Sequence, residues 1–188
     1  MKRRVIMNYT PVKAKDSYSD AKKCCCFTGH RPKSLPFGDD ESAAECVKLK
    51  EMLCKNIEQQ IVKNGVMHFI SGMAMGVDIY GVEIVLKLKE KYPQITLECA
   101  IPFEAQANRW DEKWKKRYFD IIRLSDNTTT LQTTHSRGCM MNRNRYMVDN
   151  SDVVIAVWNG EKSGIGNTVR YAKKCGKKII LIDPDKLK

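Results

Sequence analysis

The sequence has no run of about 20 consecutive apolar residues, which is the length that an α-helix needs to cross a bilayer. Its basic N-terminal stretch is not followed by the apolar segment of a secretory signal. It also has no linker, internal repeat or low-complexity segment. These absences predict a cytoplasmic protein with no membrane partner, in which residues 1–22 form a flexible basic lead-in and residues 23–188 form one domain.

The sequence also lacks a Cys-x-x-Cys pair and any His/Cys cluster with the spacing of a zinc site, although it contains 8 cysteines. Most of these cysteines lie inside apolar stretches, as at 24–26 and at Cys99. We therefore expect reduced, mostly buried thiols, no metal site and no bound cofactor.

Negative charge is scarce, because 33 Lys and Arg oppose 22 Asp and Glu, which gives a formal net charge of +11. Such an excess favours anionic partners, either nucleic acid or a phosphorylated small molecule. A lysine-rich solvated surface is the alternative, since much of the excess lies in the N-terminal stretch and in scattered lysines. Charge alone leaves both interpretations open.

From residue 24 onward, short apolar runs alternate with stretches of helical periodicity. The predicted strands are 24–28, 66–70, 95–101, 128–132, 153–158 and 178–182. The predicted helices are 41–63, 76–91, 105–124, 138–150 and 167–175. Strands that alternate with helices indicate right-handed crossovers, so we expect an α/β fold: a Rossmann-like three-layer α/β/α sandwich with a mainly parallel sheet.

In such a sheet, ligands bind beyond the carboxyl ends of the strands, where helix N-termini present free N–H groups. The first strand ends in a turn that contains Gly29, His30 and Arg31. Glycine permits a tight turn, and arginine can bind a phosphate with two hydrogen bonds. His30 can donate a hydrogen bond or serve as an acid or base.

The second turn contains Ser71, Gly72, Met73, Gly76 and Asp78, and its two glycines lie four residues apart. Such a turn could surround an anion with backbone amides, although it is neither a Walker loop nor a Gly-x-Gly-x-x-Gly motif. Asp78 falls in the first turn of the following helix, where it either interacts with the helix dipole or holds a ribose hydroxyl.

The third turn contains Gly164, Gly166, Asn167 and Thr168 at the start of another predicted helix. The glycines allow a close approach, while Asn167 and Thr168 supply a cap and a side-chain donor. An ordinary capped helix is the alternative. Three turns of this kind at one edge of the sheet predict a phosphate site more specifically than any one of them.

Arg143, Asn144 and Arg145 follow one another on a predicted helix, so they cannot all face the same way. We expect Asn144 and Arg145 to reach the site and Arg143 to be solvated at the surface.

These stretches, taken in order, resemble the SLOG superfamily, which contains DNA-processing protein A, the LOG nucleotide phosphoribohydrolases and the YpsA-like proteins. The segment from Ile70 to Asp78 is similar to the Ile-Ser-Gly-x-Ala-x-Gly-[Ile/Val]-Asp pattern of DNA-processing protein A, as Arg143–Arg145 and Ser163–Ala172 are to later parts of that family. Segments 102–106 with Trp110, and 134–137, look more like the YpsA-like branch. The resemblance covers roughly residues 24 to 183.

The resemblance implies a pocket for a nucleotide or nucleotide-derived molecule. The phosphoribohydrolases carry the motif Pro-Gly-Gly-x-Gly-Thr-x-x-Glu, whereas this sequence reads SGIGNTVRY and has Arg170 or Tyr171 near the position of that glutamate. The sequence also lacks the additional domains of DNA-processing protein A, so the recombination role of that family is not transferred.

Three hypotheses follow. The first is a non-catalytic nucleotide-binding or sensing protein, and the second is a protein that binds single-stranded nucleic acid through aromatics such as Phe37, Trp110 and Trp158. The third is a nucleotide N-glycosidase, with possible acid or base groups at Asp78, Glu83, Glu104 and His135. A homo-oligomer is possible under each of them.

Overall fold

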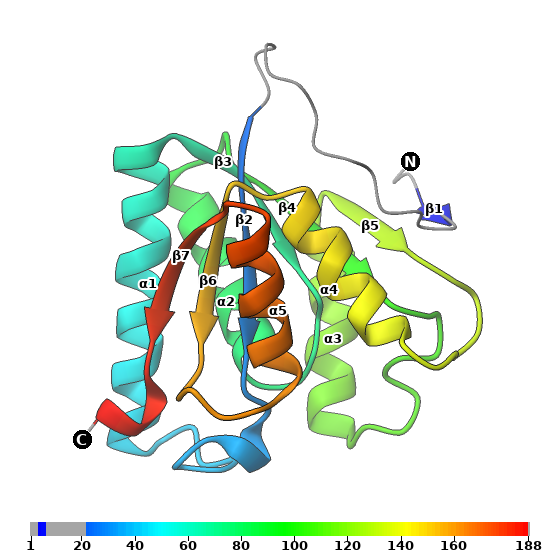
Figure 1. The fold of residues 1–188 in the computed structure, drawn as a ribbon, viewed down its shortest axis with the longest axis horizontal. Coiled ribbons are helices and arrows are strands. Elements are labelled where there is room, and N and C mark those ends of the chain that lie inside the picture. The colour runs from blue at the N-terminus through cyan, green and yellow to red at the C-terminus, as the bar shows by residue number, and fades with distance from the viewer. Residues whose placement is uncertain (1–3, 7–21, 188) are drawn as a thin grey trace.

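The sheet contains seven strands, all parallel, in the order β1-β5-β4-β3-β2-β6-β7 (Figure 1). The structure is a computed structural model, and it describes residues 4–6 and 22–187. The strands are β1 (Arg4–Ile6), β2 (Lys23–Gly29), β3 (Val66–Ser71), β4 (Thr96–Ile101), β5 (Asn127–Thr130), β6 (Val153–Val157) and β7 (Lys178–Ile182). The helices are α1 (Ala44–Asn64), α2 (Val77–Lys91), α3 (Glu112–Leu124), α4 (Cys139–Asp149) and α5 (Gly164–Lys174), with short 3-10 turns η1 (Pro32–Ser34) and η2 (Pro184–Lys186).

The helices lie in two layers, with α1, α2 and α3 on one face of the sheet and α4 and α5 on the other (Figure 1). The larger core packs α1, α2 and α3 against the sheet, and a smaller core packs α4 and α5 against the opposite face. Every residue of β6 is buried, as expected for a strand that is covered on both faces. The expected Rossmann-like α/β/α sandwich is confirmed, with six strands within 22–187 and β1 added at one edge.

Helical periodicity predicts α1 well, because Cys46, Leu49, Leu53, Ile57 and Ile61 form its buried stripe and Gly65 ends it with φ 67°. The predicted helix 105–124 is wrong over its first part, since α3 begins only at Glu112, after the cap Asp111 accepts a 3.0 Å hydrogen bond from the amide of Trp114. Trp110 precedes the helix and still packs edge-on against Tyr118. Trp110 therefore contacts Tyr118 without being part of the helix, although its spacing in the sequence is that of a helical residue.

The expectation for the N-terminal stretch meets the structure only in part. Within the expected flexible lead-in, Arg4–Ile6 instead pairs with β5 as a strand; residues 1–3 and 7–21 lie outside the described residues.

All eight cysteines are free and five of them are buried, in agreement with mostly buried thiols. In the described part of the chain, no helix is long and apolar enough to span a membrane, and no three His, Cys, Asp or Glu side chains are grouped to hold a metal ion.

Candidate ligand-binding site

The strand order reverses at β2, because the chain passes from β2 to β3 on one side while β6 lies on the other. The helix that follows β2 covers one face of the sheet, and α5, which follows β6, covers the opposite face (Figure 1). In open parallel sheets this point is where ligands bind, since the two connections diverge there. Gly29 and Val157 pair at the ends of the two strands and mark its position.

The turn after β2 contains a buried histidine and an exposed arginine. His30 is buried, and its Nε2 has no hydrogen-bond partner within the described residues. Burial lowers the pKa of His30, against the opposing effects of nearby Asn159, Glu161 and Asp185, so the imidazole is neutral near pH 7 and can donate or accept one further hydrogen bond. Arg31 is exposed, and its side chain makes no hydrogen bond or ion pair within residues 4–6 and 22–187.

Most polar groups of the turn after β3 are used by the protein itself. Ser71 Oγ accepts from the amide of Met73 at 3.1 Å, and the Asp78 carboxylate accepts from the amide of Ala74 at 3.2 Å. The amide of Val77 donates to the carbonyl of His30 at 3.3 Å, which ties this turn to the turn after β2. These bonds leave fewer amides for an anion than the glycine spacing predicts.

Two features of this turn depend on close packing. Gly76 has φ 88°, and a Cβ there would lie 2.6 Å from the carbonyl oxygen of His30, so only glycine fits. Met73 is fully buried and is the one non-glycine residue with positive φ in the described chain, at 56°. Gln106 holds this strained position, because its side-chain amide donates to the carbonyl of Met73 at 2.6 Å.

The structure corrects the assignment of the two arginines on α4. Arg143 is buried rather than solvated: its Nη1 donates to the carbonyl of Gly72, and its guanidinium lies 3.8 Å from the carboxylate of Asp78. Burial raises the pKa of Asp78, and Arg143 opposes that shift. Arg145 is exposed and lies over the ring of Tyr171, so its predicted ligand contact stays a prediction.

Asn144 links this buried arginine to the start of α5. Its side-chain oxygen accepts from Arg143 Nε at 2.8 Å, and its amide donates to the hydroxyl of Thr168 at 2.8 Å. Thr168 is buried and donates to the carbonyl of Gly164 at 3.0 Å. A continuous chain of hydrogen bonds therefore connects the turn after β3 with the first turn of α5, and Asn144 and Thr168 position groups within it.

Helix α5 begins earlier than the sequence predicts, so Gly164 and Gly166 belong to its first turn. Its cap is Ser163, whose hydroxyl accepts from the amide of Gly166 at 3.2 Å; the predicted cap at Asn167 is wrong. Gly166 packs against Trp158, whereas a Cβ on Gly164 would meet no atom within 4 Å. The amides of Gly164 and Ile165 donate to no described residue, so the positive end of α5 is open.

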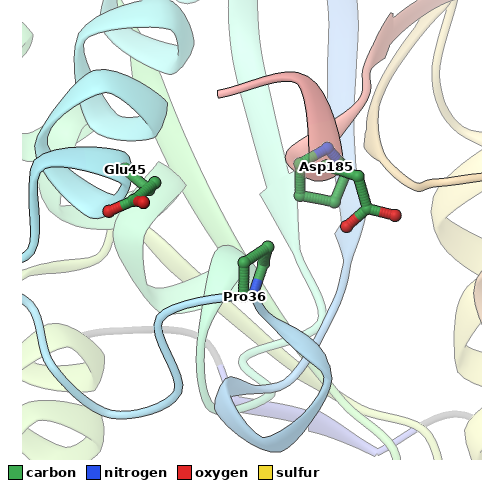
Figure 2. A pocket seen from close by; sticks show the side chains of 4 residues that line it. Pro36, Glu45 and Asp185 are labelled. Carbon is green, nitrogen blue, oxygen red and sulfur yellow. The ribbon is translucent and has the colours of Figure 1, made fainter. Parts of the chain in front are cut away.

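A hollow of about 150 Å³ lies at the same edge, lined by Pro36, Glu45, Pro184 and Asp185. Figure 2 shows Pro36 between Glu45, at the start of α1, and Asp185, in the C-terminal turn. Its volume is below the roughly 300–1,000 Å³ of small-molecule sites, and its charged groups are carboxylates. This hollow is a poor match for a phosphate, so the candidate site is the neighbouring edge formed by His30, Arg31 and α5.

The other candidate acid and base groups lie on α2 and in the loops that follow β4 and β5. Glu83 pairs with Arg117 at 2.7 Å, and Glu104 and His135 are exposed, with His135 edge-on to Phe103. The rings of Phe37 and Trp110 pack against the larger core. Within the described residues, Glu104 and His135 therefore lie at the ends of β4 and β5, which β3 separates from β2 in the sheet, and two of the three candidate aromatics pack against the core.

Sequence reasoning missed Arg143 and Gln106, which hold the turn after β3. A usable signal was present for the arginine, because Cys139, Arg143 and Met147 are spaced four residues apart and all three are buried. No periodic pattern marks Gln106, whose partners lie 33 and 34 residues away.

Comparison with known proteins places the chain in a family. The YpsA model, described as the YspA SLOG family, matches residues 25–187. The chain belongs to this YpsA SLOG family. The expected membership of the SLOG superfamily and its YpsA-like branch is thereby confirmed.

Relatives of this YpsA-family protein include the uncharacterized SPbeta prophage-derived protein YoqJ of Bacillus subtilis, 33% identical over 74% of this chain and 90% of YoqJ. The UPF0398 protein BH1768 of Halalkalibacterium halodurans is 31% identical over 58% of this chain, and the match spans only 61% of that relative. Among solved structures, DNA processing protein A from Helicobacter pylori superposes with a TM-score of 0.59 at 21% identity, over 87% of this chain and 66% of that one. This last likeness concerns the fold.

Proposed function

We propose that this protein binds a nucleotide or a nucleotide derivative at the carboxyl edge of the sheet, with a phosphate against the first turn of α5. The observation that carries the proposal is the open start of α5, where Gly164 leaves free space and the first amides have no partner. Such a helix start binds phosphate through its N–H groups and its dipole. Binding at this point needs no rearrangement of the hydrogen-bonded turn after β3.

The surrounding side chains suit the rest of such a ligand. Arg31 is exposed near the buried pair of Asp78 and Arg143, and its positively charged side chain forms no ion pair among the described residues. The Asn159 amide, which donates to Asp185 at 3.1 Å and lies beside the buried His30, can bind hydroxyl or base groups. The ligand that fits therefore combines an anion with neutral polar groups, as a nucleotide does.

Equilibrium binding to AMP, ADP, ADP-ribose and a cyclic nucleotide tests the proposal. Arg31→Ala should weaken binding of at least one of them by about tenfold or more, because a charged hydrogen bond contributes about 1.5–3 kcal/mol. Arg123→Ala is the matched control, since Arg123 lies at the far end of α3 with 75% of its side chain exposed. No saturable binding below about 1 mM, roughly 4 kcal/mol, would refute the proposal.

Binding without hydrolysis is the form of this proposal that the residues favour. Helix α5 contains no carboxylate, and the hydroxyl of Tyr171, near the position of the phosphoribohydrolase glutamate, donates to Asp149. Release of free base from any of these nucleotides would instead support the N-glycosidase hypothesis.

Single-stranded nucleic acid across the same edge is a second candidate. It is favoured by the net charge of +11 and by the fold that this chain shares with the Helicobacter pylori protein, whose structure was described for its single-stranded DNA binding mode. A phosphate-driven complex must weaken steeply as salt rises. Affinity for a dT20 oligonucleotide that is absent at low salt, or constant with salt, excludes this candidate.

A further inference from the structure

The chain from Lys162 to Ile182 contains no Asp or Glu, yet it holds six basic residues. Four of them, at 173, 174, 177 and 178, lie where α5 ends and β7 begins. This is the amino edge of the sheet, opposite the candidate ligand site, because α5 runs against the direction of the strands (Figure 1). The basic residues therefore lie far from the phosphate site proposed above.

Two more lysines join them from the start of β2. The backbone brings the segments together: β6 pairs with β2 on one side and β7 on the other, and the amides of Cys24 and Lys178 donate to the side chain and the carbonyl of Asp152. Neighbouring strands lie about 4.8 Å apart, so the starts of β2 and β7 are about 10 Å apart. We call the lysines of this region the amino-edge surface: Lys22, Lys23, Lys173, Lys174, Lys177 and Lys178.

These lysines differ from most others in having no carboxylate partner. Within residues 4–6 and 22–187, the side chains of five of the six form no hydrogen bond or ion pair, and the side chain of Lys177 donates only to the backbone carbonyl of Asp149. The nearby Asp149 and Asp152 already accept from Tyr171 and from the amide of Cys24. Elsewhere the lysines at 50, 89, 91, 113, 115, 116 and 186 each pair with an acid.

A favourable interaction with the C-terminal end of α5 accounts for Lys173 and Lys174. It does not account for Lys22, Lys23 or Lys178, which lie on strands or before them. We propose that the amino-edge surface binds the phosphate backbone of double-stranded nucleic acid, independently of the nucleotide proposal for the opposite edge.

The chemistry of the surface selects this partner. Lysines contact phosphates as point charges and read no bases. The aromatic ring within reach, that of Tyr171, is partly buried under Arg145, so stacking on unpaired bases is not favoured. A membrane partner would need exposed apolar side chains among the lysines, and the exposed Leu181 lies toward the opposite end of β7. A duplex offers the densest row of phosphates.

The test compares two double variants of the full chain by fluorescence anisotropy with a labelled 20-base-pair DNA duplex. Lys174→Gln/Lys178→Gln removes two charges from the amino-edge surface. Lys55→Gln/Lys87→Gln removes two exposed charges from α1 and α2, so both variants carry the same net charge. Both should fold normally, because exposed substitutions change stability by only about 0.5 kcal/mol.

The amino-edge variant should bind the duplex at least about tenfold more weakly at 50 mM salt, and its slope of log K against log salt should be smaller by about 1.8, or 0.9 per lost phosphate contact. The control should match the wild type. Equal loss in both variants, no duplex binding at 25 mM salt, tighter binding to dT20 than to the duplex, or binding to anionic phosphatidylserine vesicles but not to the duplex would each overturn the proposal. Arg31→Ala should leave duplex binding unchanged, which separates this result from failure of the nucleotide proposal.

Discussion

The guanidinium of Arg143 lies directly against the backbone of Gly72, with Nη1 donating to the carbonyl of that residue. A Cβ at position 72 would overlap the guanidinium, so the glycine makes room for the arginine. The same group lies 3.8 Å from the buried carboxylate of Asp78. One arginine therefore holds the turn after β3 and neutralises the charge that the turn buries.

Replacement of Arg143 by Met should lower the free energy of unfolding by about 3–5 kcal/mol at neutral pH, because it leaves a buried charge without its partner. Burial already raises the pKa of Asp78, and loss of Arg143 raises it further. A carboxyl whose folded pKa exceeds its unfolded value destabilises the fold as pH rises through that folded pKa, so the defect should shrink toward about pH 4. Urea unfolding across this range measures it.

Arg145→Met is the matched control, two residues along the same helix and exposed. Its effect should stay within about 0.5 kcal/mol. A loss as large as that of Arg143→Met would contradict the buried role assigned to Arg143.

Glu41 joins the loop after β2 to the α1–α3 layer, through Lys50 at 2.7 Å and through Arg117. Partial burial opposes ionisation, but hydrogen bonds from Lys50 and Arg117 prevail and lower the pKa of Glu41 to about 2. This contribution to stability is present above the unfolded pKa near 4.3 and is lost as pH falls through about 2. Glu41→Gln should therefore cost about 1 kcal/mol at pH 7, after allowance for solvent screening, and almost nothing at pH 2.

Acid titration of the unfolding free energy measures this difference. Glu51→Gln, at an exposed position on α1, should follow the wild type throughout. If Glu41→Gln shows the same pH profile as the wild type, the ion pairs do not stabilise the loop.

The alternation of strands and helices could be predicted from local patterns. The buried residues of α1 recur with helical spacing, and β6 is a continuous apolar run, so each pattern indicates the type of element directly. The position proposed for the candidate site, at the ends of β2, β3 and β6, rests on the parallel order of the strands and stays a prediction. Local patterns did not predict that Arg143, rather than Arg145, is buried. A charged side chain favours solvent, and the partners that bury Arg143 lie 65 and 71 positions earlier. The start of α3 was misplaced for a similar reason, because Trp110 keeps helical spacing through a contact with Tyr118.

The cysteines provide a check of the fold itself. Cys25 and Cys26 are fully buried, and burial raises the pKa of Cys26 to about 12, whereas Cys175 is exposed. Since the thiolate is the reactive form, one thiol should react rapidly with a disulfide reagent at pH 8, and all eight should react in urea. Cys175→Ser should remove the fast phase; rapid reaction of several thiols in the native protein would contradict this packing.

The sharpest test of the carboxyl edge separates stability from binding at Gly164. This residue lies in the first turn of α5, and a methyl group there would project into space free of protein atoms. Alanine favours a helix over glycine by up to about 1 kcal/mol, so Gly164→Ala should keep or raise the melting temperature. The same methyl group would occupy the space in front of the free amides, so affinity for the best nucleotide should fall by at least about tenfold, roughly 1.4 kcal/mol.

Gly38→Ala is the control, because Gly38 has a left-handed backbone conformation in open space. It should lower stability and leave nucleotide affinity unchanged. Unaltered affinity in Gly164→Ala would mean that no phosphate approaches the start of α5.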